Sequence, residues 1–154
     1  MAAYCDSNFF VRWGAEMTGT AEAVRLIESY QADARGLIAV TWLHRLEVTN
    51  AFQQMVFAAR QGMGINLTPE QAVLALARFD EAVTAGVHFR ETAMAPGTLV
   101  HQAGELSRRH TARHGFRAYD VAHVASALLL GCDAFWSFDA KANQLAKLEG
   151  LDTL

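Results

Sequence analysis

The part of the chain that decides the fold is residues 120–139, which read DVAHVASALLLGCDAFWSFD. Asp120 opens an almost entirely apolar run to Leu130, which predicts a buried helix that ends at Gly131. A second apolar run, Ala134 to Phe138, is short and ends on Asp139, as a buried strand does. A buried helix followed at once by a buried strand is typical of an α/β fold with a parallel sheet.

The same alternation of strands and helices extends from this stretch over the rest of the chain. Further strands are predicted at residues 2–6, 37–41 and 87–89, and from residue 151 onward. Further helices are predicted at residues 7–13, from Thr20 to about Asp33, from Trp42 to Gln61 before Gly62-Met63-Gly64, from Thr68 to Thr84, from Pro96 or Thr98 to His114, and at 140–149. The sequence therefore predicts one α/β domain over residues 1–154, with a central parallel sheet of about four to five strands flanked by helices on both faces.

Composition excludes several classes of protein. The chain has 154 residues, of which 52% are hydrophobic and 19% charged, so a compact folded protein is expected and a disordered one is not. No apolar stretch reaches the length of a membrane span, and no basic start precedes a signal-peptide core. Cys5 and Cys132 both lie in apolar runs and are expected to be reduced. We therefore expect a cytoplasmic protein that does not bind a membrane.

Four acids lie at the ends of apolar segments, where an unpaired carboxylate is costly. Asp6 follows the first strand, Glu47 lies inside the apolar pattern of a long helix, and Asp120 and Asp139 flank the stretch described above. In open α/β sheets, sites form at the carboxyl ends of the strands, so all four acids can reach one edge of the sheet. A carboxylate cluster without Cys or His favours hard cations, and the sequence predicts Mg²⁺ or Mn²⁺ bound there. Such a cluster also predicts a stability that depends on the metal.

One segment is strongly basic although the net charge of the chain is -3. No acid occurs from Leu106 to Tyr119, whereas four arginines and two histidines do. The arginines are Arg108, Arg109, Arg113 and Arg117. They form either a solvated helix face or a surface for RNA phosphates, and the second interpretation gains weight if the segment borders the acids.

These residues resemble a known family. The segments that carry the resemblance are Tyr4-Cys5-Asp6-Ser7-Asn8, Glu47, FRAYDVAHVA at 116–125, and Trp136-Ser137-Phe138-Asp139. In this order they resemble the successive motifs of PIN-domain ribonucleases, and the VapC-like toxins of bacterial toxin–antitoxin pairs most closely. The resemblance covers essentially the whole chain.

The resemblance implies a Mg²⁺- or Mn²⁺-dependent endoribonuclease with a PIN-like fold, often a homodimer neutralised by a small antitoxin protein. Asp6, Glu47, Asp120 and Asp139 match the acidic quartet, and Asn8 and Ser137 match polar positions that orient metal waters or acids. Asp6, Asp120 and Asp139 would hold the metal, while Glu47 would complete its shell or orient the attacking water. Family cleavage leaves a 5′-phosphate and a 3′-hydroxyl. Ala140 and Lys141 stand where some relatives carry a further acid, so the expectation is one tightly held metal, with a second one either absent or recruited with RNA.

Other interpretations stay open. The chain could be a PIN-like module that only binds RNA or protein, or a housekeeping PIN nuclease without an antitoxin. A phosphotransferase needs a second Asp two residues after Asp6, where Asn8 stands. For His110 with His114, and for His44 with Glu47, exposed or structural roles are favoured over metal binding, and a structural role is expected for His123. Phe9-Phe10 and Met55-Val56-Phe57 are candidates for an apolar contact surface.

Overall fold

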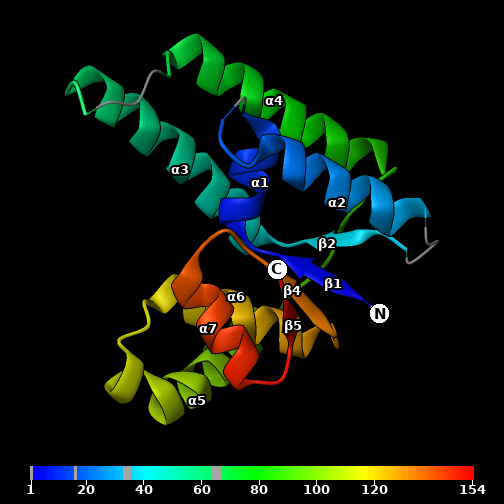
Figure 1. Cartoon of the computed structure of the whole chain (residues 1–154), viewed down its shortest axis with the longest axis vertical. Helices are drawn as coiled ribbons and strands as arrows, with labels where there is room; N and C mark the ends of the chain where they lie inside the picture. The colour runs from blue at the N-terminus through cyan, green and yellow to red at the C-terminus, as the bar shows by residue number, and fades with distance from the viewer. Residues whose placement is uncertain (1, 16, 33–35, 64–66) are drawn as a thin grey trace. The chain divides into compact units, whose positions relative to one another are not determined.

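The computed structural model describes residues 2–15, 17–32, 36–63 and 67–154 (Figure 1). These residues group into two compact units, each described by itself. The terminal unit comprises the described residues up to Asp6 together with Thr92–Leu154, and the central unit comprises Ser7–Glu91. The prediction of one domain over residues 1–154 stays a prediction.

The terminal unit is built on three parallel strands. It contains β1 (Ala3–Cys5), α5 (Pro96–His114), α6 (Ala118–Leu129), β4 (Ala134–Trp136), α7 (Ala140–Leu148) and β5 (Asp152–Thr153). The strand order is β1-β4-β5, with Tyr4 opposite Phe135 and Phe135 opposite Thr153. Parallel neighbours end at the same edge of a sheet, so the residues after β1 and β4 come together.

Packing in the terminal unit explains its apolar runs. The Tyr4 ring stacks on Phe135 with 5.9 Å between centroids and 11° between planes. The Tyr4 hydroxyl forms a 2.8 Å hydrogen bond with Nδ1 of His123, which is only 3% exposed. The structural role predicted for His123 is thus confirmed, because its ring joins α6 to β1. Burial raises the pKa of Tyr4 well above its usual range, so this hydroxyl stays protonated.

The central unit is mainly helical. It contains α1 (Ser7–Gly14), α2 (Thr20–Ala32), β2 (Ile38–Val40), α3 (Trp42–Arg60), α4 (Pro69–Ala85) and β3 (Phe89–Glu91). Strands β2 and β3 pair in parallel, with Ala39 opposite Arg90. Phe10 lies at the centre of its core, in edge-on contact with His44, Phe79 and Phe89 at centroid distances of 5.2–5.4 Å.

The predicted apolar contact surface is wrong for Phe9-Phe10 and only partly right for Met55-Val56-Phe57. Phe9 and Phe10 are both completely buried, because their ring contacts make them part of the core. Val56 is 5% exposed, whereas Phe57 is 56% exposed. Only Phe57 of these residues thus presents a large apolar surface to solvent.

Helix ends in the central unit follow local sequence signals. The Thr68 hydroxyl accepts a hydrogen bond from the Gln71 backbone N–H at 3.2 Å, and the Gln71 side chain accepts one from the Thr68 N–H at 2.8 Å. This arrangement is a capping box, with Pro69 in the first turn. Helix α4 ends at Ala85, one residue after the predicted end, and Gly86 caps it in the left-handed region with φ 63°.

The α/β class with parallel strands is confirmed, although some details differ from the expectation. Within the described residues, five strands pair as a group of three and a group of two, and each has at most three residues. Strand β3 begins at Phe89, two residues after the predicted start, and α6 begins at Ala118, two residues before Asp120. The predicted helix end near Asp33 and the Gly64 breaker lie outside the described residues. Among the described residues, no helix is both long and apolar enough to cross a membrane.

Candidate active site

Two of the four acids meet at the edge of the terminal sheet through one serine. The Asp6 backbone N–H donates to the Trp136 carbonyl at 3.1 Å, so Asp6 follows β1 directly beside the end of β4. The Ser137 hydroxyl donates to Asp6 Oδ2 at 2.6 Å and accepts from the Asp139 backbone N–H at 2.8 Å. Ser137 is 1% exposed and Asp6 is 5% exposed. A buried carboxylate is therefore held by a short, charge-assisted hydrogen bond.

Asp139 also caps α7. Its Oδ1 accepts from the backbone N–H groups of Lys141 at 2.7 Å and Ala142 at 3.2 Å. These bonds satisfy two of the donors that a helix N-terminus leaves without a partner. A carboxylate offers about four lone-pair positions, so two such bonds to one oxygen leave capacity for a cation at the other.

Asn143 is a member of this cluster that the sequence did not single out. Its Nδ2 donates to the Ser137 carbonyl at 2.8 Å, which ties the turn after β4 to α7. Its Oδ1 is buried and has no hydrogen-bond partner among the described residues. An orphaned buried amide oxygen is unusual and is a hard donor of the kind that Mg²⁺ accepts. The spacing of four residues after Asp139, one helical turn, is the only signal that could have found it.

Asp120 lies in the first turn of α6, in the same unit. Its Oδ2 accepts a 3.1 Å hydrogen bond from the Arg117 backbone N–H, which closes the N-terminal turn. Helix α6 packs against both β4 and α7, the two elements on either side of Ser137. The first turn of a helix is also where its dipole favours a negative charge. The third predicted acid is therefore fixed by the backbone, as Asp139 is.

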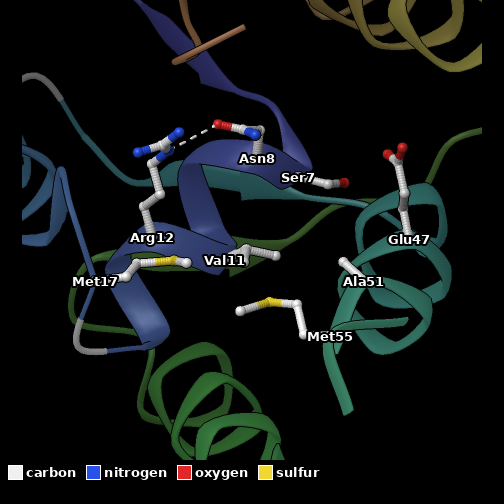
Figure 2. Close-up of a pocket in the computed structure, with 8 residues that line it drawn as sticks. All are labelled: Ser7, Asn8, Val11, Arg12, Met17, Glu47, Ala51 and Met55. Atoms are coloured by element: carbon white, nitrogen blue, oxygen red, sulfur yellow. Dashed lines mark hydrogen bonds between the residues drawn. The ribbon is translucent and has the colours of Figure 1, made fainter. Parts of the chain in front are cut away.

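Glu47 and Asn8 belong to the central unit. Glu47 lies one and a half turns into α3, and Asn8 lies in the first turn of α1. Both line a pocket between these two helices, and Figure 2 shows the Glu47 carboxylate on the rim near Ser7. The membership of Glu47 in one site with Asp6, Asp120 and Asp139 stays a prediction from the sequence.

The oxygen atoms of the predicted ligands suit a hard cation. All the predicted ligands and Asn143 offer oxygen, which suits Mg²⁺ or Mn²⁺ and not a thiophilic metal. Within the described residues, no three His, Cys, Asp or Glu side chains form a group that could hold a metal ion. The assignment of Asp6, Glu47, Asp120 and Asp139 as a metal shell thus stays a prediction.

His44 takes part in the N-terminal cap of α3. Its Nδ1 accepts a 2.9 Å hydrogen bond from the Thr41 backbone N–H, and the ring is completely buried. His44 takes the place that Glu or Gln occupies in a capping box and starts α3. This geometry supports a structural role for His44.

The basic segment forms the second half of α5 and the turn into α6. Two of its arginines are paired with acids: Arg108 with Glu105, and Arg109 with Glu149 at 3.0 Å. The bond from Arg108 lowers the pKa of Glu105. His110 is not an exposed basic residue as expected, because its Nε2 lies 2.6 Å from Glu149 Oε1.

The remaining residues of this segment surround the same turn. The His114 ring stacks on Phe116 with 5.5 Å between centroids, and Lys141 Nζ donates to the His114 carbonyl at 2.7 Å. Arg113 and Arg117 are exposed. Arg113 in the last turn of α5 and Arg117 in the turn into α6 thus add to the exposed cationic side chains of Arg108 and Arg109.

Comparison with known proteins identifies a solved structure with a similar fold. No family model matches the chain, and no curated protein matches it in sequence. Among solved structures, the chain is similar to Mycobacterium tuberculosis VapC20, a toxin that cleaves the sarcin–ricin loop. The TM-score is 0.63 at 16% sequence identity, over 93% of this chain and 94% of that chain. The fold is VapC-like. In this VapC-like fold, the predicted acids of the terminal unit lie after β1, at the start of α6 and after β4.

Proposed function

We propose that this protein is a Mg²⁺- or Mn²⁺-dependent endoribonuclease and the toxin of a toxin–antitoxin pair. The observation that carries the proposal is the hydrogen-bonded series Asp6–Ser137–Asp139 at the carboxyl edge of β1 and β4. Acidic residues tied together at this edge of a parallel sheet are the arrangement that catalytic sites of α/β proteins use. The VapC-like fold supports the choice of reaction.

In this proposal each acid has a distinct role. Asp6, Asp120 and Asp139 hold the cation directly or through water, with Asn143 Oδ1 as a further oxygen donor. The cation, when bound, lowers the pKa of a water molecule and stabilises charge on the phosphoryl oxygens. Glu47 orients the attacking water and accepts its proton, for in-line attack that leaves a 5′-phosphate and a 3′-hydroxyl. Asn8 orients water beside Glu47.

The neighbouring residues would keep these acids in position. Ser137 restricts the Asp6 carboxylate to one orientation through its 2.6 Å bond. The backbone N–H groups at the starts of α6 and α7 do the same for Asp120 and Asp139. Catalytic groups held before the substrate binds need little reorganisation during the reaction.

The substrate class proposed is RNA, gripped by the arginines of α5 and its following turn. Arg113 and Arg117 supply exposed charge, whereas the charges of Arg108 and Arg109 are already partly compensated by acids. We expect these two groups to contribute unequally to phosphate binding. The partners proposed are a small antitoxin protein and a second copy of this chain in a cytoplasmic homodimer.

Cleavage of a mixed pool of single-stranded RNA tests the proposal. The wild-type protein should cut it with Mg²⁺ or Mn²⁺ and stop when EDTA is added. Asp6→Asn and Asp120→Asn should reduce the rate at least about 100-fold, while Asp152→Asn, an exposed acid of the same unit, should not. Equal rates for Asp6→Asn and Asp152→Asn would remove the assignment.

A second candidate is a binding module without catalysis. The observation that favours it is that Asp120 and Asp139 both close helix N-termini, so stability alone could retain them. Such a module would bind RNA or a protein equally well with and without EDTA and would leave the RNA uncut. A housekeeping nuclease without an antitoxin would cut RNA but would lack a neighbouring antitoxin gene.

A further inference from the structure

The central unit contains a pocket of about 320 Å³ between α1 and α3. Its walls are apolar: Val11 on α1, Ala51 and Met55 on α3, and Met17 just after α1. Figure 2 shows Val11, Met17 and Met55 pointing into the same space, with Ala51 and Met55 one turn apart on one face of α3. Its volume is at the lower end of the range for small-ligand sites, about 300–1,000 Å³.

The rim of this pocket is polar on both sides. On the α1 side, Arg12 Nε donates to Asn8 Oδ1 at 3.2 Å, and Arg12 Nη1 donates to the Thr18 carbonyl at 2.5 Å. These bonds fix the guanidinium and orient the Asn8 amide, so that its oxygen faces Arg12 and its NH₂ group is directed elsewhere. On the α3 side stands the Glu47 carboxylate.

A flat heterocycle with polar edges satisfies both parts of this pocket. Thioethers make favourable contacts with aromatic rings, and Met17 and Met55 supply two of them from different segments. A held amide and a held guanidinium at the mouth suit the acceptor groups on the edge of a base. A purely apolar peptide side chain would fill the walls but would form no hydrogen bond with the Asn8 amide or the Arg12 guanidinium at the mouth.

We propose that this pocket binds one unstacked nucleobase of the RNA substrate. The base lies between Met17 and Met55, with its acceptor edge toward the Asn8 NH₂ group and Arg12. This inference rests on the proposed function, because Glu47 lines the same pocket and is the residue proposed to orient the attacking water. The pocket then selects which nucleotide lies near the scissile phosphate, since a base taken out of its stack is read by such contacts.

Methionine methyl NMR tests the pocket without any catalysis. Protein labelled with [methyl-¹³C]methionine is titrated, in the absence of divalent metal, with each of the four ribonucleoside 5′-monophosphates. The ring current of a bound base should shift the Met17 and Met55 signals in a saturable way. The Met63 and Met94 signals should not move, because neither residue lines the pocket.

Three results of this titration would overturn the proposal. The Met17 and Met55 signals could stay fixed with all four nucleotides. All the methionine signals could drift together without saturation. The two signals could respond to acetyl-phenylalanine amide and to no nucleotide, which would assign the pocket to a peptide side chain.

A cleavage experiment tests the selection itself. Ala51→Met should fill the pocket, whereas Ala77→Met adds the same side chain at an exposed position of α4. We expect Ala51→Met to lose the base preference of the wild type at its cut sites and to raise KM about tenfold or more, since binding one base contributes on that scale. Ala77→Met should keep both properties.

The smaller Met17→Ala variant serves as a second test, because Met17 is 36% exposed and its truncation leaves the core intact. It should weaken the same preference. Unchanged base preference in both pocket variants would refute the proposal while leaving cleavage intact. Absence of cleavage by the wild-type protein would instead refute the proposed function, and the NMR titration would still report on the pocket.

Discussion

Replacing Ser137 with alanine should lower the free energy of unfolding by about 2–4 kcal/mol. The lost bond runs from the Ser137 hydroxyl to Asp6 Oδ2 at 2.6 Å, between groups that are 1% and 5% exposed. A hydrogen bond to a charged group contributes about 1.5–3 kcal/mol. The Asp139 backbone N–H also loses its acceptor, and a partly buried unpaired donor adds on the order of 1 kcal/mol.

Urea unfolding followed by far-UV circular dichroism measures this loss. Ser107→Ala is the matched control, because its hydroxyl donates to the neutral Thr111 hydroxyl at 3.2 Å, on a half-buried face of α5. That neutral bond should contribute less than about 1 kcal/mol. If both variants lose the same free energy, within about 0.5 kcal/mol, the buried Asp6–Ser137 bond does not carry the stability argued for it.

Three further predictions concern separate residues. Asp139→Ala should lower the free energy of unfolding by about 0.5–2 kcal/mol, because the cap of α7 is lost. Asp139→Asn keeps a good cap, so it should unfold like the wild type yet cut RNA far more slowly. Equal cleavage by the Asp139→Asn variant and the wild type would contradict the metal assignment. Burial raises the pKa of the Cys132 thiol from 9.0 to about 11, so the unfolded chain loses this proton at a lower pH than the folded protein does. The free energy of unfolding should therefore fall between pH 9 and 11, and Cys132→Ala should reduce this fall. An unchanged pH profile in the variant would argue against burial of Cys132 as the cause. For RNA binding, Arg113→Ala should reduce the steepness of the plot of log binding constant against log salt concentration by about 1. Arg109→Ala should reduce it by less, because Arg109 is already paired with Glu149. Equal changes in the two variants would show that this ion pair does not affect phosphate binding.

Local signals made much of the fold predictable. The Thr68 cap, the Gly86 stop and the end of α5 at Gly115 depend on residues within one turn, so the sequence specifies them directly. The edge position of Asp6 and Ser137 was also predictable, because parallel strands end on one side. The terminal part of the candidate site followed from these two rules.

Features that depend on the spacing of distant elements were not predictable. The bond from Asn143 to the Ser137 carbonyl requires the angle between α7 and β4, which no motif encodes. The pocket wall formed by Val11 and Met55 depends on the distance between α1 and α3, which no motif encodes either. The burial of Phe10 was missed because a pair of phenylalanines at a helix start looks alike in a core and on a contact surface.

The capping bonds at the starts of α6 and α7 have a consequence for how the protein would meet its ion. Folding alone aims the oxygens of Asp120 and Asp139, since peptide N–H groups hold them in place. A divalent ion could then arrive and depart without either helix melting. Ion supply would then control activity, and loss of the ion would lower stability through repulsion among the acids and not through melting of these two helix starts.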